Sequence, residues 1–127
     1  MLKRVITLPD APKLPFSAAI RAGDYIFVSG QIGHTDAGGK KVKGIEGQVR
    51  QCLENMKKVL AAAGSSLDEV VKVTVFLRNQ ADFARMNEIY QSYFAEDRPA
   101  RSTVIADLAL PSMLIEIDCI AYFPPKT

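Results

Sequence analysis

The chain has 127 residues and a mass of 13.9 kDa, the size of one domain that can bury its own core. Hydrophobic residues make up 48% and charged residues 24%, which excludes a disordered chain, and a net charge of +2 argues against a nucleic-acid-binding surface. No apolar run approaches the roughly 18 residues of a membrane span, and the N-terminus lacks the apolar segment of a signal peptide. We therefore expect a single cytoplasmic domain, residues 1–127, with no nucleic acid and no membrane as a partner.

The cysteines and the histidine do not indicate a disulfide framework or a metal site. Cys52 and Cys119 are too few for a disulfide scaffold and lack the spacing of metal ligands, so we expect two reduced, buried thiols. His34, the one histidine, lies in a glycine-rich stretch without the partners that a zinc site or a Ser-His-Asp triad needs.

The N-terminal part of the chain predicts three strands. Residues 2–8 form a short segment with β-branched side chains, which predicts an edge strand. The prolines between positions 9 and 15 then exclude regular structure. Residues 17–21 and 25–31 flank a turn that contains Gly23, and they predict a β-hairpin.

The middle of the chain predicts a loop, a helix and a strand. Residues 33–44 hold four glycines and several lysines, which is typical of a mobile surface loop. Apolar residues then recur at spacings of three and four, which predicts a helix that ends at Gly64. Residues 66–69 match a capping box and predict one helical turn, and the β-branched residues 70–77 predict a buried strand. The apolar face of the helix consists of Ile45, Val49, Cys52, Leu53, Met56, Val59, Leu60 and Ala63.

A second helix and two strands complete the chain. Residues 81–94 predict a helix with an apolar stripe in the core, and Asn87 on that stripe needs hydrogen-bond partners there. Residues 101–108 predict a strand, Pro111 marks a turn, and residues 113–123 predict the last strand. The stripe consists of Phe83, Met86, Tyr90, Tyr93 and Phe94.

This order of elements predicts an α+β fold. The order is a strand, a hairpin, a helix, a strand, a helix and two more strands. Helices separated by a single strand, together with strands that follow each other directly, indicate a two-layer sandwich. This sandwich is a mixed sheet of about six strands with two helices on one face. The opposite face of the sheet then needs a cover, and partner subunits are the simplest one.

The last predicted strand carries two carboxylates on one face. Residues alternate between the two faces of a strand, so Glu116 and Asp118 point away from the set that suits a helix-covered core. This pattern fits an ordinary solvated face. It also fits a cleft or a subunit interface where a carboxylate orients a water or accepts a proton.

Two further residues stand at the ends of predicted strands. Arg101 is either a surface charge or a bidentate partner for a small carboxylate, which its planar guanidinium fits. Ser29 precedes Gly30, where another group can approach the backbone closely, and its hydroxyl is either satisfied locally or available to a ligand. No glycine-rich segment has the spacing of a phosphate-binding loop.

Several separated motifs resemble one known family along nearly the whole chain. The run from Pro99 to Val104, Leu110-Pro111 and the run from Ile115 to Ala121 resemble the C-terminal signature of the reactive intermediate deaminase family, also called the YjgF family. Phe27-Val28-Ser29-Gly30-Gln31 resembles its N-terminal strand motif. The middle of the chain matches at Ala62-Ala63-Gly64, at residues 73–77 and at Asp82, Phe83, Asn87, Tyr90 and Phe94.

The resemblance implies a chorismate-mutase-like fold in a homotrimer, with the sheets around a central barrel and three sites in the clefts between subunits. It implies hydrolysis of enamines and imines, such as 2-aminoacrylate or 2-iminobutyrate, to 2-oxo acids and ammonia. Pyridoxal-phosphate-dependent dehydratases release such intermediates. The resemblance implies no cofactor and no metal for the protein itself.

The resemblance also assigns roles residue by residue. Arg101 matches the arginine that holds the substrate carboxylate, and Glu116 matches the glutamate that positions the attacking water. Ser29 lines the same cleft, and the backbone carbonyl of Thr103 contacts that water. Asn87 matches a helix asparagine that we interpret as supporting structure.

One stretch departs from the family pattern. Phe16 stands where the family commonly has a tyrosine that faces the ligand, and Leu14 precedes it, so the choice of substrate is open. Thr103 replaces a frequent cysteine, at a position where only the backbone is implicated. Two alternatives to the deaminase remain, a non-catalytic trimer that binds small carboxylate metabolites, and a ribonuclease or translation inhibitor. The near-neutral charge weighs against the ribonuclease.

Overall fold

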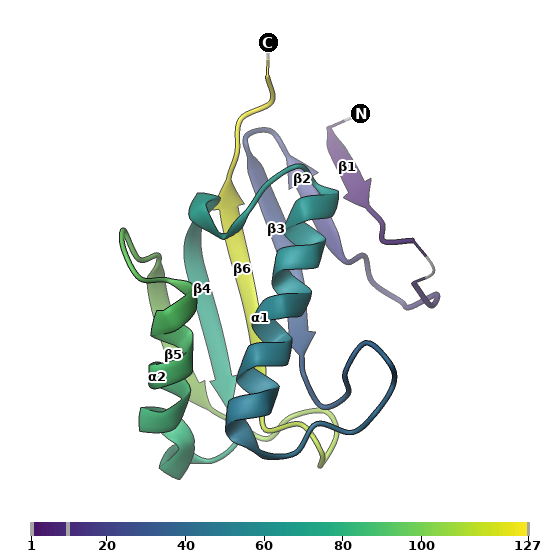
Figure 1. Ribbon diagram of the computed structural model, residues 1–127. Coiled ribbons are helices and arrows are strands. Elements are labelled where there is room, and N and C mark those ends of the chain that lie inside the picture. Colours follow the sequence, from purple (N-terminus) through teal and green to yellow (C-terminus); the bar gives the residue numbers. More distant parts are fainter. Residues whose placement is uncertain (1, 10, 127) are drawn as a thin grey trace.

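The computed structural model describes residues 2–9 and 11–126, which form one six-stranded mixed sheet with two helices (Figure 1). The strand order is β1-β2-β3-β6-β4-β5, and the neighbours are antiparallel except β4 and β5, which are parallel. The strands are β1 (Lys3–Ile6), β2 (Ala19–Ala22), β3 (Tyr25–Ile32), β4 (Val70–Leu77), β5 (Ala100–Ile105) and β6 (Ile115–Tyr122).

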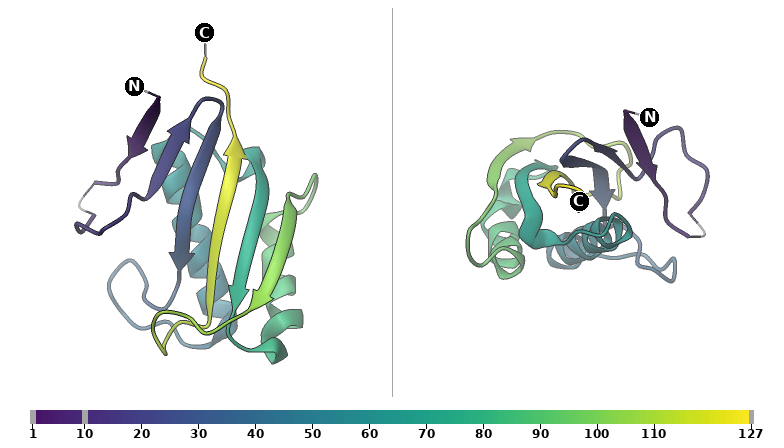
Figure 2. Two further views of the ribbon diagram at one scale, coloured as in Figure 1. Left: turned by 180° about the vertical axis from the view of Figure 1, so that it is seen from behind. Right: turned by 90° about the horizontal axis from the view of Figure 1, so that it is seen from above.

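Both helices cover the same face of the sheet, and the opposite face carries none (Figure 2). They are α1 (Gly44–Ala62) and α2 (Phe83–Tyr93), and short 3-10 helices at Leu67–Glu69 and Gln80–Asp82 precede β4 and α2. The predicted α+β two-layer sandwich is therefore confirmed. No helix in residues 2–9 and 11–126 is long and apolar enough to cross a membrane.

The helix α1 forms as its apolar spacing predicts. Its buried side chains face the sheet, and Gly64, at a φ of +82°, ends it with a backbone turn. The Ser65 N–H donates to the Leu60 carbonyl at 2.8 Å, which satisfies one carbonyl of the last turn. The buried set comprises Gln48, Val49, Cys52, Leu53, Met56, Val59 and Leu60.

The alternation predicted for β6 is also confirmed. Ile115, Ile117, Cys119 and Ala121 are buried beneath the helices, and the residues between them point to the uncovered face. Both cysteines are buried free thiols. Burial raises the pKa of Cys119 to about 12, so its thiol is inert at neutral pH.

Three local predictions need correction. Phe83 does not enter the core, because α2 begins there and its ring, 42% exposed, lies over the edge strand β5. The strand β5 ends at Ile105, which is paired with Leu77, the last residue of its neighbour β4. The turn at Leu67–Glu69 forms, but the Ser66 side chain makes no capping hydrogen bond.

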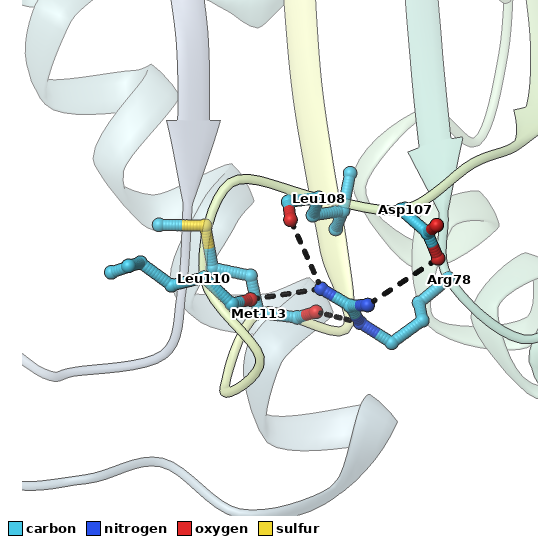
Figure 3. A network of polar contacts seen from close by, with 5 residues as sticks. All are labelled: Arg78, Asp107, Leu108, Leu110 and Met113. Carbon is cyan, nitrogen blue, oxygen red and sulfur yellow. Dashed lines mark hydrogen bonds and ion pairs between the residues drawn. The ribbon is translucent and has the colours of Figure 1, made fainter.

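Arg78 fastens the loop that connects β5 to β6 (Figure 3). It follows the last residue of β4, and its Nε and Nη2 donate to the carbonyls of Met113 and Leu110, both at 2.8 Å. A longer bond to the Leu108 carbonyl and an ion pair with Asp107 at 3.8 Å complete the set. The guanidinium thus satisfies loop carbonyls and fixes the chain just before β6 begins.

The uncovered face of the sheet is partly apolar. Tyr25, Phe27, Val104 and Tyr122 are between 43% and 44% exposed on it, and the rings of Tyr25 and Tyr122 pack edge to face at 5.3 Å. Such a face is stabilised when another surface removes it from water. The predicted cover by partner subunits stays a prediction.

Candidate functional site

Arg101 lies in an unusual environment on the edge strand β5. It pairs with Val73 in the parallel ladder, so its side chain shares the helix-covered face with that buried valine. Its guanidinium is half-buried over the ring of Tyr90, with the central carbon 4.7 Å from the ring centroid, and Nη1 lies 4.0 Å from the Met86 sulfur. Within residues 2–9 and 11–126, no carboxylate lies within ion-pair distance of Arg101.

The other hydrogen-bonded arginines show how different this is. Arg78 donates to three carbonyls, and Arg85 pairs with Glu46 at 2.7 Å and with Glu88 at 2.6 Å. Arg98 donates to the Phe94 carbonyl, and Arg21 donates to the carbonyls of Gly23 and Phe123. In the part of the chain that the structure describes, Arg101 donates to no oxygen and only weakly to the Met86 sulfur at 4.0 Å, so its charge and most of its N–H donors remain open for an anion.

A cavity of about 330 Å³ opens beside Arg101, between α2 and the start of β5. Asn87 and Tyr90 contribute a buried amide oxygen and a buried hydroxyl to this region, and neither has a hydrogen-bond partner among the described residues. A buried polar atom without a partner costs about 1–3 kcal/mol. The Asn87 amide oxygen therefore favours a polar occupant here. The lining consists of Asn87, Tyr90, Gln91, Arg98, Pro99 and Arg101.

Thr103 follows on the same face of β5, two residues beyond Arg101. It lines a second cavity, of about 440 Å³, together with the exposed ring of Phe83 and the end of β5. The Thr103 hydroxyl is buried and has no partner within the described chain. We call Arg101, Thr103 and Asn87 together the β5 half-site.

Glu116 lies on the opposite face of the sheet. It pairs with Phe76 in the β4 ladder and shares the uncovered face with Asp118. A bulge in β3 between Val28 and Gln31 brings Gly30 against it, so closely that a Cβ atom at Gly30 would overlap the carboxylate. Burial raises the pKa of Glu116 above its ordinary value, and the neighbouring Asp118 charge raises it further.

Ser29 occupies the same bulge and ties it to the loop before β2. Its hydroxyl donates to the Ser17 carbonyl at 2.5 Å. Of the two alternatives that the sequence left open for this hydroxyl, the structure shows the local hydrogen bond. A role for Ser29 toward a ligand stays a prediction. Phe16, next to Ser17, is 58% exposed and stands out from the loop. We call Glu116, Gly30, Ser29 and Phe16 together the β6 half-site.

The two half-sites do not meet within one chain. Arg101 and Thr103 belong to the edge strand β5 and face the helices, while Glu116 belongs to β6 and faces away from them. Phe16 lies in the segment between β1 and β2, the two strands at the other edge of the sheet. A single small ligand can therefore contact both half-sites only where two copies of the chain meet.

The sequence pointed to the orphaned amide of Asn87 but missed Tyr90. We assigned this tyrosine to the core from its helical spacing, and its ring is indeed buried. Its contact with Arg101 joins the helix α2 to the strand β5, which come together only in the folded chain. No group of three or more potential metal ligands occurs in residues 2–9 and 11–126.

Gly30 gives a direct test of the space around Glu116. We expect Gly30→Ala to lower any activity that depends on Glu116 at least tenfold, because the methyl group displaces the carboxylate. The midpoint of thermal unfolding should change little, since the displaced atoms are the end of a flexible side chain. Gly33→Ala is the contrasting control, because its methyl group meets the backbone of α1 and should destabilise the fold. Normal activity in Gly30→Ala would show that the carboxylate position does not matter.

Comparison with known proteins shows the family of the chain. The model of the family described as Endoribonuclease L-PSP matches residues 8–123. A RutC family protein of Pyrococcus horikoshii is 49% identical over 95% of this chain and 98% of its own. A protein of Dermatophagoides farinae named 2-iminobutanoate/2-iminopropanoate deaminase is 38% identical over 93% of this chain and 94% of its own.

A solved structure gives the same result for the fold. Escherichia coli TdcF, crystallised with bound serine, superposes with a TM-score of 0.84 at 33% identity, over 94% of this chain and 98% of TdcF. The chain therefore belongs to the Endoribonuclease L-PSP family, also called YjgF, whose members include proteins named as reactive intermediate deaminases.

Proposed function

We propose that this protein hydrolyses small enamines and imines of 2-amino acids to 2-oxo acids and ammonia, at a site formed between two copies of the chain. The observation that carries this proposal is the half-buried guanidinium of Arg101, which has no carboxylate partner in the described chain and an open cavity beside it. An unpaired charge in such a place is stabilised by an anionic ligand. The family's named imine deaminases supply the chemistry that fits a small carboxylate.

The reaction needs one positioned water and one proton acceptor. Arg101 binds the substrate carboxylate through parallel N–H donors, which fixes the imine carbon next to Glu116 of the other copy. The Glu116 carboxylate accepts a proton as water adds to that carbon, while the Thr103 carbonyl accepts a hydrogen bond from the same water. Glu116 then passes this proton to the nitrogen, which gives a carbinolamine. The hydroxyl proton of the carbinolamine moves to the nitrogen as the carbon–nitrogen bond breaks, so ammonia leaves and a 2-oxo acid remains. An enamine first takes a proton at its terminal carbon and loses one from its nitrogen, which gives the imine.

This mechanism asks little of the protein. Imines hydrolyse readily in water, so orientation and one general base suffice, and a base of this kind contributes about 10²–10⁴-fold. Every group named belongs to the chain, so the proposal includes no cofactor and no metal. We also propose a cytoplasmic location, where dehydratases release such intermediates.

The separation of the half-sites requires self-association, and we propose a homotrimer. The exposed aromatic residues of the uncovered face would then be buried at the centre of the assembly. We expect sedimentation equilibrium at micromolar concentration to give about three times the 13.9 kDa of one chain. A stable monomer at that concentration would contradict the composite site.

A ribonuclease remains the second candidate, because the family description names an endoribonuclease. RNA cleavage commonly uses a histidine base, and the His34 ring instead hydrogen-bonds to the Ser112 hydroxyl at 2.8 Å. The net charge of +2 also provides little attraction for RNA. A non-catalytic carboxylate binder would need Arg101 but not Glu116.

One assay separates these candidates. A threonine dehydratase generates 2-iminobutyrate in place, and the release of 2-oxobutyrate is timed with and without the protein. We expect faster release with the protein, and no cleavage of single-stranded RNA. Unchanged release together with tight binding of 2-oxobutyrate would favour the non-catalytic binder, and RNA cleavage that survives purification would favour the ribonuclease.

A further inference from the structure

Tyr90 is the main neighbour of the open guanidinium. Its side chain is 5% exposed, and its ring packs against Phe94 with the two centroids 4.8 Å apart. Phe94 is itself buried in the core, so the ring of Tyr90 has little freedom to move. The guanidinium of Arg101 lies over this ring, and the more exposed ring of Phe83 lies 5.9 Å from the same guanidinium.

An aromatic ring holds an arginine in a different way from a carboxylate. A carboxylate would fix Arg101 by occupying its N–H donors, which would then be unavailable to a ligand. The face of a ring attracts the cation through its quadrupole and leaves those donors free. The ring therefore restricts the guanidinium without competing for its hydrogen bonds.

We infer that Tyr90 is a positioning residue, whose buried ring holds the Arg101 guanidinium in the orientation that binds a carboxylate. The role in catalysis rests on the proposed function, while the contact itself does not. The ring carries the effect, because the guanidinium lies over the ring while the hydroxyl makes no hydrogen bond among the described residues. Tyr90→Phe should therefore behave like the parent, and Tyr90→Leu should not.

The size of the effect follows from the contact. A cation over a ring contributes an amount equivalent to about 2-fold to 30-fold in an equilibrium, more when the pair is shielded from water. We expect Tyr90→Leu to weaken 2-oxobutyrate binding about tenfold and to raise KM for the imine similarly, with kcat within about threefold. Tyr90→Phe should keep all three values within about twofold of the parent.

The matched control is Tyr93→Leu, the same substitution on the same helix. The ring of Tyr93 lies beneath Lys57, 6.0 Å from its ammonium, whereas the Arg101 guanidinium lies over the rings of Tyr90 and Phe83. Tyr93→Leu should therefore leave 2-oxobutyrate binding unchanged. A general loosening of α2 would instead weaken binding in both leucine variants, which would overturn the positioning role.

The order of the guanidinium provides a readout without catalysis. The ¹⁵Nε order parameter of Arg101, assigned with Arg101→Lys, should fall in Tyr90→Leu and stay unchanged in Tyr90→Phe and Tyr93→Leu. The proposal is overturned if Tyr90→Leu retains both this order and the affinity for 2-oxobutyrate. It is also overturned if Tyr90→Phe loses as much affinity as Tyr90→Leu, because the hydroxyl would then contact the ligand.

These readouts separate the inference from the proposed function. A parent that binds 2-oxobutyrate but hydrolyses no imine removes the proposed function, and the affinities and the order parameter still decide the role of Tyr90. A parent that binds no carboxylate at all overturns both.

Discussion

Arg101→Lys should reduce both imine hydrolysis and 2-oxobutyrate binding roughly 100-fold, because lysine keeps the charge but loses the two parallel donors. The ammonium is also more strongly hydrated and lacks the planar group that packs over the Tyr90 ring in the parent. The fold should persist, since Arg101 donates no hydrogen bond to a carbonyl of the described chain. The rate of 2-oxobutyrate release and a calorimetric titration with 2-oxobutyrate check this result.

Arg98→Lys is the control for that variant. Arg98 lines the same cavity, but it bonds to the Phe94 carbonyl at 2.8 Å and is exposed. The Arg98→Lys variant should therefore retain activity close to that of the parent. If Arg101→Lys matches the parent in both measurements, Arg101 does not anchor the carboxylate. If both variants lose binding equally, the cavity attracts anions only by its general charge.

Glu116→Gln should lower kcat/KM about 100-fold, because an amide cannot accept the proton of the attacking water. Binding of 2-oxobutyrate should change far less, since the carboxylate of the ligand contacts Arg101 rather than Glu116. The variant should fold normally, because burial already disfavours the charged form of Glu116. Full activity in Glu116→Gln would exclude this residue as the base.

The pH dependence provides a second measurement on Glu116. Only the ionised carboxylate accepts a proton, and burial and Asp118 raise its pKa above the ordinary value. The ratio of parent to Glu116→Gln activity should therefore fall as the pH is lowered through that raised pKa. Asp118→Asn removes the neighbouring negative charge, so it should move this decline to lower pH while leaving the maximal rate similar. A decline at the same pH in Asp118→Asn would show that the charge of Asp118 does not raise the pKa of Glu116.

Local sequence patterns predicted most of the fold. The strand β4 spans the predicted residues 70–77, and the alternation in β6 separates buried from exposed side chains as expected. These features depend on neighbours in the chain. The end of β5 and the exposure of Phe83 depend on contacts with distant segments, and the predictions for both were wrong.

The candidate site could be predicted only as a set of residues. The sequence pointed to Arg101 and Glu116 and placed Glu116 on the uncovered face. It could not place Arg101 on the opposite face, because that follows from the pairing of β5 with β4 and of β4 with β6. The pairing joins segments far apart in the chain, and a shift by one residue would exchange the faces.

Complementation between two inactive variants tests the composite site most directly. Arg101→Ala and Glu116→Gln chains are co-expressed with different tags, and oligomers that carry both tags are purified. A mixed cyclic trimer contains one interface with both Arg101 and Glu116 intact, so it should recover about one third of the parent activity. If the mixed oligomers are as inactive as the two parental variants, the site does not form between copies of the chain and the account is wrong.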